Sequence, residues 1–269
     1  PLYNLDVSGN IRATGNIIVD NTQNTVAIGN ITGMTNQSTN TNTIAIGNAA
    51  GYTDQSIYSV AIGYYAGHLR QGPQAVAIGQ HAGQGRNQDL TLTTPYINNT
   101  KQEEGAIAIG HYAGFDGQGL KSINIGYASG AHLGTSMDSN GDLPNVGSVS
   151  IGWYTTKRNT YNDCVAIGSH AAENGQKEFS ISIGSYSSRV YQQKTGSIAI
   201  GYQAAYYGIG ENSIAIGHKA GYSESSVNNT IILNATGSDL QGTTANALYI
   251  APIRKEDPTT KTPILQYTD

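Results

Sequence analysis

The decapeptide NSIAIGHKAG, residues 212–221, decides the fold, because near-copies of it recur along the whole chain. Its centre is a four-residue pattern: Ile or Val, then Ala, Ser or Asn, then Ile, then Gly. The pattern occurs eleven times, and its copies end at the repeat glycines Gly29, Gly47, Gly63, Gly79, Gly110, Gly126, Gly152, Gly168, Gly184, Gly201 and Gly217. Six of the ten spacings are 16 residues, and the others are 17, 18, 26 and 31. A short fixed period of this kind indicates units that stack on one another.

Each repeat predicts one coil of a β-solenoid. In the copy Val60-Ala61-Ile62, large and small side chains alternate, so the two large ones share one face of a short strand and the alanine lies on the other. Sixteen residues are too few for a helix with its connections, and the glycine-rich, β-branched composition disfavours one. The sequence therefore predicts an all-β, two-sided parallel solenoid of about eleven to twelve coils.

The large aliphatic side chains are the predicted core of each coil. With only two such side chains per coil the core is thin, and alanine-rich faces would stay exposed on a single chain. Association through the alanine faces would bury them, and a homotrimer is the simplest closed arrangement. The predicted core isoleucines precede the repeat glycines and are Ile46, Ile62, Ile78, Ile109, Ile125, Ile151, Ile167, Ile183, Ile200 and Ile216.

Two further features of the repeat concern its turns. A degenerate twelfth copy ends in Asn234, and because Asn tolerates the left-handed backbone region best after Gly, the sequence predicts a positive φ there. The third and fourth residues after each repeat glycine are small, as in Ala66-Gly67 and Ala82-Gly83. This constant size predicts that another stretch of backbone passes close by.

The composition excludes several classes of function. The chain has 269 residues, 12% of them charged, and a net charge of −4 with singly scattered Lys and Arg, which argues against nucleic-acid or anionic-membrane binding. It contains no run of about 18 apolar residues, so we expect no membrane insertion. Its lone cysteine, Cys164, gives no disulfide framework and is expected to pack as a small hydrophobic residue.

The sequence predicts neither catalysis nor a cofactor. The string GFDGQGLKS, residues 114–122, is like a phosphate-binding loop, but Leu120 interrupts its Gly-Lys step. Asp138, Asn140 and Asp142 have the spacing of a calcium loop, but the glycine and the bidentate Glu that such a loop needs are missing. An Asx-rich turn is the alternative reading of that stretch. We therefore expect no metal site and no enzymatic activity.

Recognition is expected at the variable positions of the repeat. The first and second residues after each repeat glycine are enriched in Tyr and His, which stacking would align into a stripe along the rod. The alternative is that these rings only pack in ladders against neighbouring coils. Two insertions, residues 84–105 and 131–147, are further candidates for receptor contact. The alternatives are that they are surface loops without a binding role, or that they hold the chains of the trimer together. The candidate receptor-binding residues are Tyr64, Tyr65, Tyr96, Lys101, His111, Tyr112, Trp153 and Tyr154.

The repeats carry a family resemblance. The segments NSIAIGHKAG, YSVAIGYYAG (58–67) and QAVAIGQHAG (74–83) resemble the repeats in the heads of trimeric autotransporter adhesins, the YadA-like left-handed parallel β-roll. Similar repeats occur in fibres of phages and large DNA viruses. The flanking segments LDVSGNIRATGNIIVD (5–20), NALYIAPIRK (246–255) and PTTKTPILQY (258–267) are similar to segments of viral fibres. The bacterial family usually has slightly shorter repeats, a signal peptide and an outer-membrane anchor.

The resemblance implies a domain organisation and a function. We expect a lead-in segment at 1–23, a β-roll at 24–234 and a β-rich cap or linker at 235–269. The implied protein is a homotrimeric fibre on the surface of a virus or phage, which binds a glycan or protein receptor on the host. A bacterial adhesin head, displayed on the cell surface and binding host matrix or glycans, is the alternative.

Overall fold

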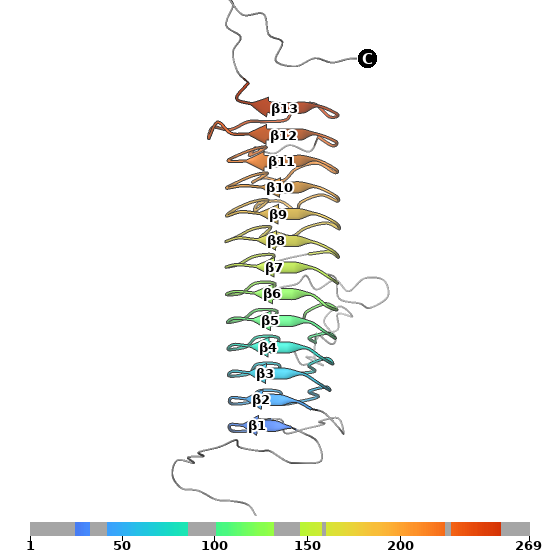
Figure 1. The fold of residues 1–269 in the computed structure, drawn as a ribbon, viewed down its shortest axis with the longest axis vertical. Coiled ribbons are helices and arrows are strands. Elements are labelled where there is room, and N and C mark those ends of the chain that lie inside the picture. Colours follow the sequence, from blue (N-terminus) through green and yellow to red (C-terminus); the bar gives the residue numbers. More distant parts are fainter. Residues whose placement is uncertain are drawn as a thin grey trace, which may run out of the picture.

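The protein is a straight stack of β-coils (Figure 1). The computed structural model describes residues 25–32, 42–85, 101–131, 146–157, 160–223 and 227–253, and this part of the chain contains strands and turns but no helix. The strands are β1 (Val26–Ile28), β2 (Ile44–Ile46), β3 (Val60–Ile62), β4 (Val76–Ile78), β5 (Ile107–Ile109), β6 (Ile123–Ile125), β7 (Val149–Ile151), β8 (Val165–Ile167), β9 (Ile181–Ile183), β10 (Ile198–Ile200), β11 (Ile214–Gly217), β12 (Ile231–Asn234) and β13 (Leu248–Ala251). The predicted all-β parallel solenoid is confirmed.

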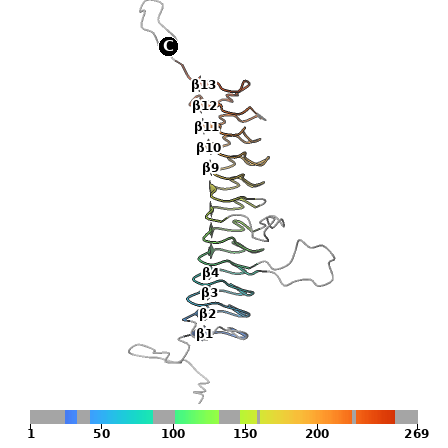
Figure 2. The ribbon, with the colours of Figure 1, turned by 90° about the vertical axis from the view of Figure 1, so that its right-hand side faces the viewer.

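The strands form a single parallel sheet in chain order. Each strand pairs with the next in register, so that Ala61 lies beside Ala77 and Ile62 beside Ile78. Isolated bridges, such as Gln71 with Gln102, pair the return side of neighbouring coils. Figure 2 shows the strands in line along one side of the rod and the turns projecting away from them. The sheet continues to β13, one strand past residue 234, where the sequence places the end of the roll.

The strand alanines, not the isoleucines, point into the coil. Ala61, Ala77 and Ala108 are 0% exposed, whereas the large residues on either side of each of them are half-buried. The prediction that the isoleucines form the core of the coil is wrong for all ten residues, which are half-buried or exposed: Ile46, Ile62, Ile78, Ile109, Ile125, Ile151, Ile167, Ile183, Ile200 and Ile216. The predicted association through alanine faces fails for the same reason, because those faces are already inside the chain.

The interior is small because a column of glutamines fills it. We call this column the glutamine spine; its members lie eight residues before a repeat glycine and are Gln55, Gln71, Gln102, Gln118, Gln176 and Gln193, each at most 1% exposed. Gln71 Nε2 donates across the coil to the carbonyl oxygens of Val60 at 2.8 Å and Ala75 at 3.2 Å. It also donates to Gln102 Oε1 in the next coil, at 3.2 Å. These bonds offset the cost of burying the amide nitrogen, whereas Gln71 Oε1 is buried without a hydrogen-bond partner.

The small residues after each glycine make room for this spine. A Cβ on Gly67 would lie 2.9 Å from Gln71 Oε1, and one on Gly83 would lie 2.7 Å from Gln102 Oε1. The close neighbour of these positions is therefore a glutamine side chain, and not a second stretch of backbone as predicted.

The repeat glycines form a column of their own. Their φ angles run from +116° to +142°, and a Cβ on Gly63 would lie 2.7 Å from the carbonyl oxygen of Gly79 in the next coil. Both the backbone angle and the contact exclude a side chain. Asn234 ends the column differently: it has no positive φ, contrary to the prediction, and it continues β12. Its Nδ2 instead donates to the carbonyl oxygen of His218 at 2.8 Å.

The free cysteine occupies one position of this frame. Cys164 is 1% exposed and lies directly before β8, where Ser180 stands before β9. Its Sγ donates to the carbonyl oxygen of Lys177 at 3.0 Å. Burial raises the pKa of the thiol. The expected packing role of Cys164 is confirmed.

Enlarging a strand alanine should break the coil. We expect Ala61→Leu to lower the free energy of unfolding by about 1–3 kcal/mol or more, because the Ala61 Cβ already lies 3.3 Å from the Cβ position of Gly67. Ala61→Ser is the matched control, since Ser150 and Ser182 occupy the equivalent place in β7 and β9. Urea unfolding followed by circular dichroism measures both; equal stability of the two variants would contradict the inward placement.

Removing one amide from the spine should also be costly. Gln102 Nε2 donates to the carbonyl oxygens of Val76 and Ala106 and to Gln118 Oε1, at 2.9, 3.1 and 3.2 Å. Gln102→Met keeps the volume but should cost about 1–3 kcal/mol for each buried group left unpaired. Gln80→Met, at an exposed position, is the control. A Gln102→Met variant that unfolds at the wild-type urea concentration would show that the spine does not stabilise the coil.

Candidate binding surface

The turn after each strand holds its side chains in an unusual backbone conformation. The second residue after every repeat glycine has φ between +48° and +59°; these residues are Ile31, Ala49, Tyr65, His81, Tyr112, Ala128, Tyr154, His170, Tyr186, Gln203 and Lys219. For a residue with a side chain, this region costs about 1–2 kcal/mol. The large rings found at many of these positions are therefore not chosen for backbone preference, and their contacts have to offset the strain.

The rings stack from coil to coil. His81 and Tyr112 have ring centroids 4.9 Å apart with planes inclined by 5°, and His170 and Tyr186 are 5.2 Å apart with planes inclined by 7°. In-register parallel coils repeat every 4.7–4.9 Å or so, which is close to the preferred distance between stacked rings. The predicted stripe along the rod is confirmed, and so is the packing of its rings in ladders.

A second column runs beside the first. The fifth residue after a repeat glycine contacts the second, as Tyr65 does His68 at 4.4 Å and Tyr112 does Phe115 at 4.8 Å between ring centroids. Sequence reasoning missed this column, although its constant offset from the glycine marks it. We call the first, second and fifth positions together the aromatic ladder.

Most of the predicted receptor-binding residues lie on this ladder. Those that it brings together are Tyr64, Tyr65, His111, Tyr112, Trp153 and Tyr154. Tyr64 and Trp153 are the most open of them, at 47% and 49% exposed. Lys101 instead forms an ion pair with Glu103, with 3.0 Å between nitrogen and oxygen. Tyr96 and most of both insertions, residues 86–100 and 132–145, lie outside the described residues.

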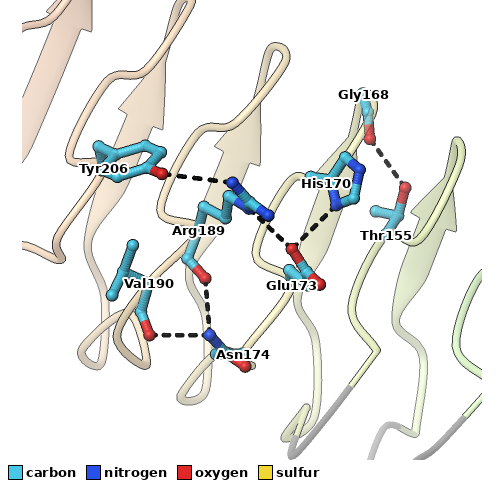
Figure 3. Close-up of polar contacts among 8 residues, drawn as sticks. All are labelled: Thr155, Gly168, His170, Glu173, Asn174, Arg189, Val190 and Tyr206. Carbon is cyan, nitrogen blue, oxygen red and sulfur yellow. Dashed lines mark hydrogen bonds and ion pairs between the residues drawn. The ribbon is translucent and has the colours of Figure 1, made fainter.

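Charged residues replace rings at the fifth position in the turns after β8 and β9 (Figure 3). Glu173 Oε2, in the turn after β8, accepts a hydrogen bond from Arg189 Nε at 2.8 Å and lies 2.9 Å from His170 Nδ1. Arg189 also donates to the Tyr206 hydroxyl at 3.3 Å, which links the turns after β8, β9 and β10. Burial raises the pKa of Glu173, but the hydrogen bonds from Arg189 and His170 outweigh it and hold that pKa below its usual value of 4.5.

The stretch that is like a phosphate-binding loop falls on ordinary positions of the frame. In the stretch 114–122, Gln118 belongs to the glutamine spine and Lys121 lies in the turn before β6. The calcium-like stretch with Asp138, Asn140 and Asp142 lies outside the described residues. Within the part that the structure describes, no group of three or more His, Cys, Asp or Glu residues is placed to hold a metal. No helix there is able to cross a membrane.

One protein-family model matches a short part of the chain. The family model described as YadA head domain repeat (2 copies) matches residues 209–220. Together with the parallel β-solenoid, this match supports a YadA-like head repeat as the repeating unit. No curated protein and no solved structure matches the chain.

The ion pairs of Glu173 give the ladder a dependence on pH. Because the pKa of Glu173 is lowered in the folded protein, its contribution to stability is present above about pH 4.5 and is lost as the pH falls through the lowered pKa. We expect Glu173→Gln to reduce the free energy of unfolding at pH 7 by up to about 1 kcal/mol, since the site is partly exposed, and by much less at pH 3.

Urea unfolding of the wild type and the variant at both pH values tests this expectation. Glu211→Gln, an exposed residue in the turn before β11, is the control. A loss of stability that is the same at pH 7 and pH 3 would show that the carboxylate charge is not involved.

Proposed function

We propose that this stack of YadA-like head repeats is the rigid head or shaft of a homotrimeric surface fibre that carries a receptor-binding face to a host. The proposed activity is binding, without a catalytic step or a cofactor. The observation that carries the proposal is the apolar outer face of the sheet.

Two columns of large aliphatic side chains run along this face from β1 to β13. In the single chain they are half-buried or exposed, with Ile44 36%, Ile167 36% and Ile216 40% exposed. Monomeric soluble proteins rarely expose a continuous apolar strip of this length, and such strips mark association surfaces. The face extends over every coil, so a partner that covers it must run parallel to the rod.

A second and third copy of the chain are the partners that fit. A rotation about an axis parallel to the rod brings the same strip of each copy to the centre, and a closed cyclic assembly leaves no strip uncovered. YadA-type heads are typically homotrimeric, which favours three copies over two. The isoleucines that do not form the core of the coil would then form the core of the trimer.

The aromatic ladder stays accessible in such a trimer. It lies on the turns that follow the strands and not on the strand face, and Tyr64, Tyr127, Trp153 and Tyr202 are 43–49% exposed. Tyr and Trp rings supply large rigid contact areas for sugars and for proteins. Three identical ladders on one fibre would bind a multivalent host surface far more tightly than one ladder does.

The proposed setting is the fibre of a virus or phage. The flanking segments 5–20, 246–255 and 258–267, which are similar to those of viral fibres, support this setting. A bacterial adhesin head on the cell surface is the second candidate, and the match to the YadA head repeat favours it. Both settings place the chain outside the cell and use the same trimer.

Charges on the apolar face should separate the trimer without unfolding the coil. We expect the wild type to sediment at three times 28.3 kDa. The double variant Ile62→Asp, Ile78→Asp should sediment as a monomer with an unchanged circular dichroism spectrum, because the charges meet solvent in the monomer but an apolar centre in the trimer.

Tyr58→Asp is the control, since Tyr58 is 57% exposed and lies outside the strand. A wild type that sediments as a monomer, or a double variant that still sediments as a trimer, would rule out association through this face.

A further inference from the structure

One rung of the aromatic ladder keeps the ring at its first position, Tyr127, but lacks the other two. In the turn after β6 both columns carry alanine, Ala128 at the second position and Ala131 at the fifth. The turns on either side carry large residues at the same positions. The gap is a hollow of ≈ 240 Å³ lined by Tyr112, Phe115, Tyr127, Ala128, Ala131, Tyr154 and Lys157.

The hollow has the height of one ring. Because the coils repeat every 4.7–4.9 Å or so, the rungs above and below the alanine rung are about 9.6 Å apart. A ring seated midway would lie about 4.8 Å from each of them, within the range preferred for stacked ring centroids. The rungs that face the gap are Tyr112 with Phe115 on one side and Tyr154 on the other. Tyr127 also lines the gap and packs edge-on against Tyr154, with ring centroids 5.4 Å apart.

The charge at the rim is positive. Lys157 Nζ lies over the Tyr154 ring, 5.0 Å from its centroid, and forms no ion pair with a carboxylate among the described residues. No acidic side chain among the described residues lines the hollow, although the chain as a whole has a net charge of −4. Tyrosine hydroxyls add polar groups, so the site combines ring faces, hydrogen-bonding groups and one cation.

We propose that this hollow binds a pyranose ring that bears a carboxylate, as in an acidic sugar of a host glycan. The pyranose takes the place of the missing second-position ring between Tyr112 and Tyr154, and Lys157 pairs with the carboxylate. A pyranose presents apolar C–H faces to aromatic rings and hydroxyls to the rim. The assignment rests on the proposed function, since it names the ligand class for one site on the ladder of the fibre.

The test measures binding of methyl glycosides to the whole chain by saturation-transfer NMR titration. The probes are the glycosides of glucuronic acid and N-acetylneuraminic acid as acidic sugars, and that of glucose as a neutral one. The expected result is saturable binding of an acidic probe at least tenfold tighter than that of glucose.

Two variants locate the site. Ala128→Tyr restores the rung, in a backbone conformation that Tyr112 and Tyr154 already adopt, and should weaken binding of the acidic probe at least tenfold. Lys157→Gln should remove the preference for the acidic probe over glucose. Gln203→Tyr places the same ring at the same position of a distant coil and should leave binding unchanged.

Several outcomes would overturn the assignment. These are absence of saturable binding, equal affinity for glucose, or acidic-sugar binding that Ala128→Tyr leaves intact. Binding that appears only after residues 132–145 are replaced by a short Gly-Ser linker would also overturn it, by showing that the chain's own insertion competes for the hollow. The mass of the same samples separates the two proposals. A trimer that binds no sugar contradicts the sugar site alone, whereas a monomer contradicts the proposed trimeric fibre.

Discussion

The hydrogen bonds of the buried glutamine amides set the width of the six coils that contain them. A glutamine such as Gln71 reaches from the return side to the strand carbonyl of Val60, so the two sides lie one side chain apart. The space left beside it takes a small residue at the centre of the strand, which is alanine or serine in most coils and Asn124 in β6. The large aliphatic residues that flank this position face outward.

This narrow interior links stability to assembly. A single chain buries alanines and amides, which contribute little apolar area, and leaves its largest aliphatic side chains open. Packing these side chains between chains would add the missing hydrophobic stabilisation, so the fold and the proposed trimer depend on the same alternation of small and large residues. The turns stay outside both cores, which leaves them free to vary and to carry the aromatic ladder.

The sequence predicted the elements of the fold better than their orientation. The repeat pattern marks the strands, and the glycine column follows from the repeat glycines. Alternation shows which side chains share a face, but not which face is inside, and the usual rule that large aliphatics form the core fails here. The glutamines that recur eight residues before the repeat glycine are the signal in the sequence that indicates which face of the strand is inside. The ladder was predicted from the Tyr and His positions. The hollow could not be predicted, because it depends on Ala128 and Ala131, and Ala131 belongs to the second column, which was recognised only in the structure.

The most direct test of this account is to find which face of the strand meets another chain. In a Cys164→Ser background, a single cysteine is placed at Ile78 or at Ala77, and the native protein is treated with a short bismaleimide cross-linker. Non-reducing gel electrophoresis in detergent then reports chains that are covalently joined. With the isoleucines between chains and the alanines inside the coil, we expect joined chains for the cysteine at 78 and none for the cysteine at 77. Joined chains at 77, or at neither position, would contradict it.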